Sequence, residues 1–345
     1  MNLKNKLEAL KKELEGQKKI YQPSLFWKKN IYKFFSIFQK EGLNKFRSNK
    51  LANNYFVPLY HLRREKFSGQ FQKIIKKNKS TRLSTEISKL MNGHGHALSD
   101  YRTFKAADDT SRLPFLHLFS ENNMGKPKEQ FKFENKLFSR SSLNYLLGIT
   151  LIKKIDKKFI IKNVLEIGGG FGILGHILGQ SKLKNFKYIN VDLPPLSLVT
   201  ENYLANVFGK NKVTDYFKIK DKSFLNINKL KMFSSFPCWK IENLKGSLDL
   251  FVNFISFQEM EPFILKNYVK HIFRLKPKYI LLRNLREGKQ KKTKFNSVGV
   301  KSQIKTNLYL NLFEKKYKLI VKNVLPFGYL TFDGFNSEIL IFKKK

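Results

Sequence analysis

Apolar residues recur at helical spacing through the first part of the chain. Leu3, Leu7, Leu10 and Leu14 follow one another at intervals of three or four, which places them on one face of a helix. Two heptads are too few for a coiled coil, so this segment predicts a short surface or docking helix. From residue 26 to about residue 75, aromatic residues recur at mostly helical spacing in a basic background. This pattern favours a packed helical region over a platform that stacks single-stranded nucleic acid.

Residues 91–130 break the helical pattern. Glycines, paired acids and turn residues predict a long irregular stretch, and loops of this length in a compact protein are usually functional or disordered. The stretch contains His94, His96, Tyr101 and Arg102, which argues against a disordered linker. We expect it to fold over a ligand cleft as a lid, with Tyr101 and Arg102 among the substrate contacts.

From about residue 141 the pattern alternates between strand and helix. The expected strands are Asn163–Gly168, Tyr188–Asp192, Met232–Phe236, Leu248–Asn253, Tyr279–Arg283, Leu319–Leu325 and Glu338–Phe342. The expected helices are Ile173–Gln180, Leu196–Phe208, Pro262–Phe273 and Gln303–Tyr317. Such alternation predicts an α/β fold with a mostly parallel sheet covered on both faces. The last two strands are close in sequence, with Gly328 and Asp333-Gly334 between them, and suit an antiparallel hairpin at the edge.

Length and composition bound the class of protein. The length of 345 residues predicts two parts, a mainly helical region over 1–140 and an α/β domain over 141–345. The single cysteine, Cys238, excludes a disulfide framework and a cysteine-based zinc cluster. The charged N-terminus lacks the apolar core of a secretory signal, and no run of about 18 apolar residues occurs, so we expect a cytoplasmic protein.

The formal net charge of +41 would attract polyanions such as nucleic acid or anionic lipid. Only ten of the 67 basic residues are arginine, however, and arginine supplies the bidentate contacts on which nucleic-acid readers depend. Drift towards lysine on solvated faces explains this composition better than RNA binding does. The charge is compatible with peripheral contact at the inner face of an anionic membrane. The sequence does not indicate an oligomeric state.

The segment Val164-Leu165-Glu166-Ile167-Gly168-Gly169-Gly170-Phe171-Gly172 carries the most specific chemistry. A strand leads into a loop of small residues, and a helix follows, so backbone N–H groups can approach a nucleotide-like ligand. Glu166 precedes the first glycine by two positions, where it could meet a cationic or amino-acid group. Asp192 ends the next strand, where its carboxylate could accept hydrogen bonds from both ribose hydroxyls.

These motifs resemble class I S-adenosylmethionine-dependent methyltransferases, over about residues 160–345. The resemblance implies a Rossmann-like sheet, S-adenosylmethionine as the methyl donor, and donor contacts at Glu166, Gly168, Gly170, Gly172 and Asp192. An NAD-dependent dehydrogenase is the structural rival. Its glycine loop rarely has an acid at the Glu166 position, and it would normally open the chain.

A narrower resemblance rests on Ile189-Asn190-Val191-Asp192-Leu193-Pro194, on Phe236-Pro237-Cys238-Trp239, and on the strand that runs into Ser256-Phe257-Gln258-Glu259-Met260. With Ser141–Leu147 and Phe335-Asn336-Ser337-Glu338, these segments are similar to sugar O-methyltransferases of bacterial surface-polysaccharide clusters. The resemblance implies a sugar or glycan acceptor. It also places Trp239 beside the adenine of the donor, although a core position for Trp239 carries equal weight.

Two places could supply a general base for a sugar hydroxyl. Glu259 follows the fourth parallel strand, where the methyl group should lie, and Gln258 could hold a neighbouring hydroxyl. His94 or His96 could act from the lid instead, since histidine is the commonest general base. The alternatives for these residues are a dipole-stabilised acid at a helix start and histidines with no catalytic role. No carboxylate cluster follows the strand, because Asp249 stands at its beginning, so we expect no metal.

Two other functions compete with sugar methylation. An RNA methyltransferase would use the basic surface as an electrostatic footprint. Enzymes that methylate amino groups of nucleic acid normally carry Asn/Asp-Pro-Pro-aromatic after this strand, and the segment Asn253-Phe254-Ile255-Ser256 has neither proline. An inactive methyltransferase fold could serve as a binding protein, but the intact Glu166, glycines and Asp192 argue against that reading.

Overall fold

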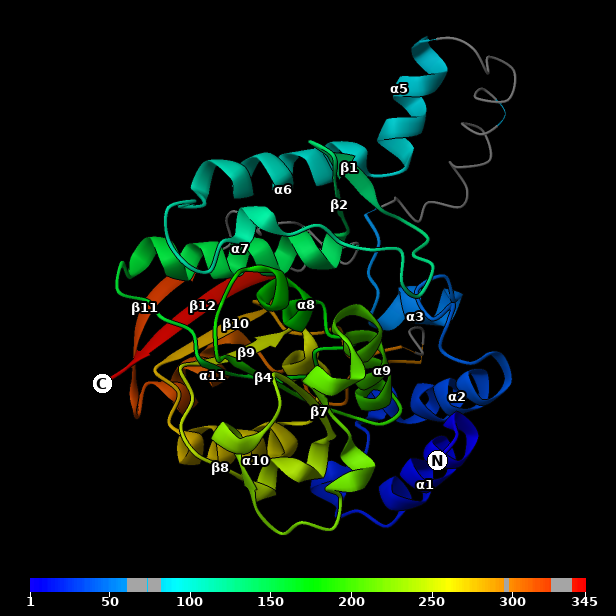
Figure 1. The fold of residues 1–345 in the computed structure, drawn as a ribbon, viewed down its shortest axis with the longest axis vertical. Coiled ribbons are helices and arrows are strands. Elements are labelled where there is room, and N and C mark those ends of the chain that lie inside the picture. The colour runs from blue at the N-terminus through cyan, green and yellow to red at the C-terminus, as the bar shows by residue number, and fades with distance from the viewer. Residues whose placement is uncertain (61–72, 74–81, 295–297, 324–336) are drawn as a thin grey trace.

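The computed structural model describes residues 1–60, 73, 82–294, 298–323 and 337–345 of the chain (Figure 1). The helices are α1 (Leu3–Glu15), α2 (Leu25–Glu41), α3 (Lys50–Tyr55), α5 (Arg82–Met91), α6 (His94–Ala107), α7 (Arg140–Ile155), α8 (Ile173–Gln180), α9 (Leu196–Phe208), α10 (Pro262–Leu275) and α11 (Thr306–Phe313). The strands are β1 (Phe131–Phe133), β2 (Lys136–Phe138), β3 (Asn163–Ile167), β4 (Lys187–Asp192), β5 (Val213–Thr214), β6 (Leu225–Asn226), β7 (Phe233–Pro237), β8 (Leu244–Lys245), β9 (Leu250–Phe254), β10 (Tyr279–Leu285), β11 (Tyr317–Asn323) and β12 (Ser337–Lys344).

The central sheet has the order β11-β12-β10-β9-β3-β4-β7-β5 in the described part of the chain. Strands β10, β9, β3, β4, β7 and β5 are parallel, whereas β12 is antiparallel to both β10 and β11. The predicted Rossmann-like α/β sheet and its antiparallel C-terminal pair are therefore confirmed. The predicted turn residues Gly328 and Asp333-Gly334, and Phe335-Asn336 of the closing motif, lie outside the described residues.

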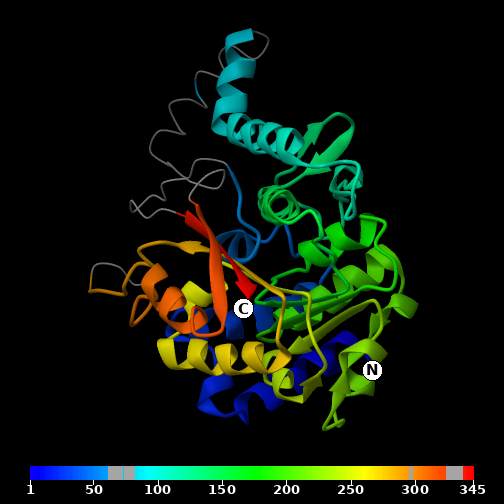
Figure 2. The same ribbon diagram turned by 90° about the vertical axis from the view of Figure 1, so that its left-hand side faces the viewer.

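The chain order creates a switch point in this sheet. From β3 the chain moves through β4 towards β7, and it returns to the other side of β3 to form β9 and β10. Open α/β sheets bind ligands at such a point, beyond the carboxyl ends of the strands. Helix α7 covers one face of the sheet and α10 covers the other, as the two views show (Figures 1 and 2).

The N-terminal helices pack onto this sheet domain. In α1, Leu7, Leu10 and Leu14 are buried, which confirms the predicted docking helix. Helix α2 buries six apolar side chains along one side, because they recur at helical spacing. Both helices lie at the α10 side of the sheet (Figure 1). The division between 1–140 and 141–345 stays a prediction.

The expected irregular stretch over residues 91–130 is wrong in its first half, because His94–Ala107 forms α6. Gly93, with φ of 78°, turns the chain into this helix. Ala97, Tyr101 and Phe104 are buried, so a helical repeat of three and four residues is present. The flanking glycines obscured that repeat in the sequence.

No helix in the described ranges is both long and apolar enough to cross a bilayer.

Candidate functional site

A cavity of about 260 Å³ lies beyond the carboxyl ends of β3, β4, β9 and β10. The glycine loop, Asp192 and the segment after β9 contribute to its wall, together with the first residues of α7. Parts of the N-terminal region also line it, namely Gln22, Ser24 and Trp27 from one segment and Asn54, Tyr55, Phe56 and Pro58 from another. The cavity therefore occupies the switch point of the sheet.

The glycine loop leaves β3 in a conformation that only glycine adopts easily. Gly168 and Gly170 have φ values of 72° and 63°, and both line the cavity. A Cβ atom on Gly168 would come within 2.3 Å of Ser256 Oγ. The backbone thus approaches the segment after β9 as closely as it can.

Side chains from β4 and α9 fix the loop. Asn190 Oδ1 accepts a hydrogen bond from the N–H of Gly169, and Asp192 Oδ2 accepts one from the N–H of Gly170, both at 3.0 Å. The Thr200 hydroxyl donates to the Gly170 carbonyl at 2.7 Å. These three side chains hold the loop in place, so a ligand does not need to order it.

Asp192 is placed to bind a polar ligand. Its carboxylate lies in the cavity wall, where Oδ1 also accepts a hydrogen bond from the N–H of Leu193 at 2.7 Å. Burial raises the pKa of Asp192 to about 7, and the two backbone donors oppose this shift. A carboxylate held this way at the end of the second strand can accept hydrogen bonds from vicinal hydroxyls.

Glu166 does not line the cavity, contrary to the prediction that it meets a ligand's amino-acid group. Its side chain is fully buried beneath the loop, and it accepts hydrogen bonds from the hydroxyls of Tyr145 and Tyr188. Burial raises its pKa to about 7, against the effect of both tyrosines. Tyr145 lines the cavity, so Glu166 can act on a ligand only through this tyrosine.

Glu259 lies in the cavity wall, at the end of the single 3₁₀ turn Ser256–Glu259 that follows β9. Its carboxylate is almost fully buried and has two partners. Trp27 Nε1 donates to Oε2 at 3.0 Å, and Lys289 Nζ lies 3.2 Å from Oε1. Burial raises the pKa of Glu259, whereas Lys289 and Trp27 lower it. Glu259 is thus a buried carboxylate whose basicity depends on two neighbours.

The residue before this turn has an unusual backbone. Ile255 lines the cavity and has φ of 71° and ψ of −36°, a conformation that costs a β-branched residue about 1–3 kcal/mol. Its N–H donates to the carbonyl of Arg283 at 2.7 Å, which holds the strained turn. Strain of this kind clusters at ligand sites, and the turn that follows Ile255 contributes Ser256, Gln258 and Glu259 to the cavity wall.

Gln258 also lines the cavity, but its carbonyl oxygen is already used. Oε1 accepts a hydrogen bond from the N–H of Leu285 at 2.5 Å. Only its amide nitrogen has no partner in the described part of the chain. The predicted contact of Gln258 with a substrate hydroxyl would therefore use this nitrogen as the donor.

The structure separates His94, His96, Tyr101 and Arg102 from the cavity, whose wall contains none of them. The ring of His94 contacts Phe133, and the ring of Tyr101 stacks on Phe133 at 4.8 Å. His96 and Arg102 are exposed on α6. The predicted lid is instead a helix that packs on α7 (Figure 1), so this structure gives His94 and His96 no position from which to act as a base.

Gly172 and Trp239 also lie outside the cavity wall. A Cβ on Gly172 would come within 2.7 Å of Thr200 Cγ2, so this glycine permits close packing of the loop against α9. Trp239 is buried in the 3₁₀ helix Cys238–Asn243, which favours its core interpretation over stacking on a ligand. Asp249 lies at the amino end of β9, opposite the cavity, where it accepts hydrogen bonds from the backbone N–H groups of Lys162 and Asn163.

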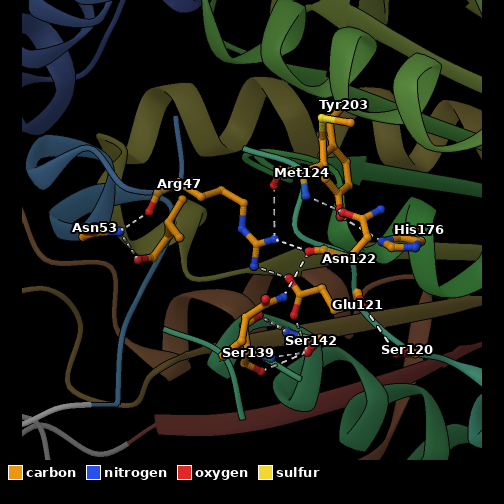
Figure 3. Close-up of polar contacts among 12 residues, drawn as sticks. Arg47, Asn53, Ser120, Glu121, Asn122, Met124, Ser139, Ser142, His176 and Tyr203 are labelled. Carbon is orange, nitrogen blue, oxygen red and sulfur yellow. Dashed lines mark hydrogen bonds and ion pairs between the residues drawn. The ribbon is translucent and has the colours of Figure 1, made fainter. Parts of the chain in front are cut away.

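A buried ion pair joins two segments of the N-terminal region, and one of its members also contacts the glycine loop (Figure 3 draws the pair). Arg47 and Glu121 are fully buried and bonded to each other, and the Ser142 hydroxyl donates to Glu121 Oε2 at 3.2 Å. The guanidinium carbon of Arg47 lies 5.0 Å from the ring centroid of Phe171, a loop residue that lines the cavity. This network fixes the segment that leads to Asn54–Pro58 on the cavity.

His176 belongs to the same region (Figure 3) and has a structural role. Its Nδ1 lies 2.8 Å from the Tyr203 hydroxyl, and its Nε2 lies 2.8 Å from Gln180 Nε2. Burial lowers the pKa of His176 to about 3, so the ring stays neutral. The described residues contain no group of three or more His, Cys, Asp or Glu side chains placed to hold a metal ion.

The participation of the N-terminal region was not predicted. Trp27 and the 54–58 segment reach the cavity through tertiary packing that leaves no local motif. The sequence signal nearest to it is the concentration of aromatic residues after residue 26, which by itself predicts helix packing.

Comparison with known proteins gives matches in structure alone. No family model matches the chain, and no curated protein sequence matches it. The pyocyanin biosynthetic protein PhzM is 9% identical with a TM-score of 0.38, over 59% of this chain and 57% of that one. The chain therefore spans little more than half of PhzM.

Two further similar structures are methyltransferases that hold S-adenosylhomocysteine. The 1,6-didemethyltoxoflavin-N1-methyltransferase of Burkholderia thailandensis is 13% identical with a TM-score of 0.39, over 60% of this chain and 79% of that one. The magnesium protoporphyrin IX methyltransferase of Synechocystis PCC 6803 is 11% identical with a TM-score of 0.42, over 72% of this chain and all of that one. At these identities the similarity concerns the fold.

Proposed function

We propose that the chain is an S-adenosylmethionine-dependent methyltransferase that acts on a hydroxyl of a sugar or glycan, as in surface-polysaccharide biosynthesis. One observation supports this most strongly. The cavity brings the glycine loop and Asp192 together with Glu259, so groups suited to a nucleoside and a carboxylate suited to a hydroxyl share one space.

The residues present fit the donor. Gly168 and Gly170 line the cavity without a side chain, and Asp192 can accept hydrogen bonds from the donor's ribose hydroxyls. When bound, S-adenosylmethionine supplies a methyl group that its positive sulfur already activates. The protein then has to align the acceptor and exclude water. Trp27 and the 54–58 segment, which cover the cavity, serve the second task.

Glu259 is the candidate base. A sugar hydroxyl is a weak nucleophile, and a positioned base contributes about 10²–10⁴-fold to such a reaction. Glu259 Oε1 would take the hydroxyl proton, and Lys289 would then lose the charge partner it has in the resting state. Trp27 keeps Oε2 in place throughout, so the carboxylate does not rotate out of reach.

Turnover of Glu259→Gln tests this proposal. The substitution keeps the shape of the side chain and removes its basicity, so methyl transfer to sugar acceptors should fall about 10²-fold or more, while donor binding remains. Glu261→Gln is the matched control, because Glu261 accepts a hydrogen bond from the N–H of Leu25 and is not among the residues that line the cavity. Turnover of Glu259→Gln within a few-fold of the wild type would contradict the assignment of the base.

A further inference from the structure

Two arginines line the cavity away from Asp192. Arg140 is the first residue of α7, and Arg283 lies in β10 and is 3% exposed. The chain uses arginine at only ten of its 67 basic positions, so two guanidinium groups in one cavity wall are a departure from its general composition. A guanidinium presents its donors in a planar fork that matches carboxylate and phosphate oxygens, which a lysine cannot do.

The two arginines share one end of the cavity. The guanidinium carbon of Arg140 lies 5.7 Å from the ring centroid of Tyr60, and its Nη1 donates to the Leu59 carbonyl at 2.9 Å. The Tyr60 hydroxyl bonds to Asp100. The charges of Arg140 and Arg283 both lower the pKa of Asp100, which burial raises. Both guanidinium groups are therefore close to the same carboxylate, which offsets part of their charge.

The sheet separates this end from the ribose end. Arg283 is on β10 and Asp192 is on β4, with β9 and β3 between them. Three strand spacings amount to about 14 Å. The ribose site and the arginines therefore belong to opposite ends of the strand row β4-β3-β9-β10.

Polar groups suited to hydroxyls lie beside the arginines. Ser141 and Asn144 follow Arg140 on α7 and line the cavity, and each is 8% exposed. Neither side chain forms a hydrogen bond with another group in the described part of the chain. Lys289, the remaining cation of the wall, is paired with Glu259. The arginine end thus combines two forked donors with side chains that can hold neighbouring hydroxyls.

We propose that the acceptor carries an anionic oxygen group, a carboxylate or a phosphate, which Arg140 and Arg283 bind while Ser141 and Asn144 contact adjacent hydroxyls. This inference rests on the methyl transfer proposed above and specifies its substrate class. Uronic acids and sugar phosphates are the two sources of such a group.

Calorimetric titration of the protein loaded with S-adenosylhomocysteine tests the proposal. The probes are D-glucuronate, D-glucose 6-phosphate and D-glucose. At least one anionic probe should bind about tenfold or more tightly than glucose, and the tighter of the two identifies the source. Arg140→Gln should abolish this preference, and Arg283→Lys, which keeps the charge, should weaken it severalfold. Arg286→Gln is the control, because Arg286 is exposed and pairs with Glu287. Equal affinities, or no binding of either anionic probe, would overturn the proposal.

A second titration separates this proposal from its alternatives. S-adenosylhomocysteine has an amino-acid carboxylate, and 5′-methylthioadenosine lacks it. Arg140→Gln should bind both with the affinity of the wild type. If it loses affinity for S-adenosylhomocysteine alone, the arginines hold the donor's carboxylate, and the anionic acceptor is refuted while methyl transfer stands. If the wild type binds neither compound, the proposed function itself fails.

Discussion

Trp27 and Glu259 are 232 positions apart in the chain, and the indole Nε1 of the first donates a 3.0 Å hydrogen bond to Oε2 of the second. The Ser24 hydroxyl also donates to the backbone carbonyl of Glu259 at 2.6 Å. The start of α2 is therefore bonded to the turn that carries the candidate base. The N-terminal helices complete the site as well as covering it.

Trp27→Phe should change the pH dependence of turnover. The indole N–H lowers the pKa of Glu259, so its removal should raise that pKa further above the ordinary value. The base must be ionised to act, so the acidic limb of the kcat/KM profile should move to higher pH. Phe38→Leu, a change on the same helix away from the cavity, should leave the limb in place. A limb that does not move in Trp27→Phe would remove the tryptophan from control of the base.

Glu166 should make the free energy of unfolding fall as pH rises. Its folded-state pKa of about 7 lies above the ordinary 4.5, so between these values the folded chain keeps a proton that the unfolded chain has lost. Raising the pH across this window should cost up to about 3 kcal/mol through Glu166. Denaturant titrations of Glu166→Gln at pH 5 and pH 8 should show a smaller loss than those of the wild type. If the free energies of unfolding of the wild type and Glu166→Gln changed equally between pH 5 and pH 8, the raised pKa of the buried Glu166 would be contradicted.

The histidines of α6 should be dispensable for catalysis. His96 is exposed and His94 contacts the ring of Phe133, and neither reaches the cavity wall. Methyl transfer by His96→Ala should therefore remain within about twofold of the wild type, since surface substitutions rarely change stability by more than about 0.5 kcal/mol. A loss of about 100-fold or more would show that α6 moves into the site.

The positive charge should give only weak binding to RNA without sequence preference. Lysines provide most of it, and their contacts with phosphate depend on counterion release. In filter binding with unrelated RNA sequences, affinities should agree within a few-fold and fall at least about tenfold between 50 and 200 mM salt. A nanomolar complex with one defined RNA that resists salt would favour an RNA methyltransferase instead.

Local sequence patterns predict the central sheet and the glycine loop well. The strand, glycine loop and helix over 163–180 are encoded within a single segment, and Asp192 and Glu259 follow from strand ends that parallel topology brings to one edge. Each of these features depends on residues that are close in sequence, or on a rule that applies to every parallel sheet.

The remaining features depend on contacts between distant segments. Glu166 points inward because Tyr145 and Tyr188 bond to it, and nothing in the motif itself distinguishes this from contact with a ligand. The contact of Trp27 with Glu259, and the cover that residues 54–58 form over the cavity, arise from the packing of separate elements. In α6, Gly93 and Gly95 concealed a helix whose buried residues recur regularly.

Calorimetric titration with S-adenosylmethionine tests the central claim, that the cavity at the glycine loop is a methyl-donor site. The wild type should bind in the micromolar range, which corresponds to about −8 kcal/mol. Asp192→Ala should weaken binding by about 1–3 kcal/mol, because the ribose hydroxyls lose a charged acceptor. Asp249→Ala, which removes a carboxylate at the amino end of β9, away from the cavity, should bind as the wild type does. Absence of binding by the wild type, or equal affinity in Asp192→Ala, would contradict the account.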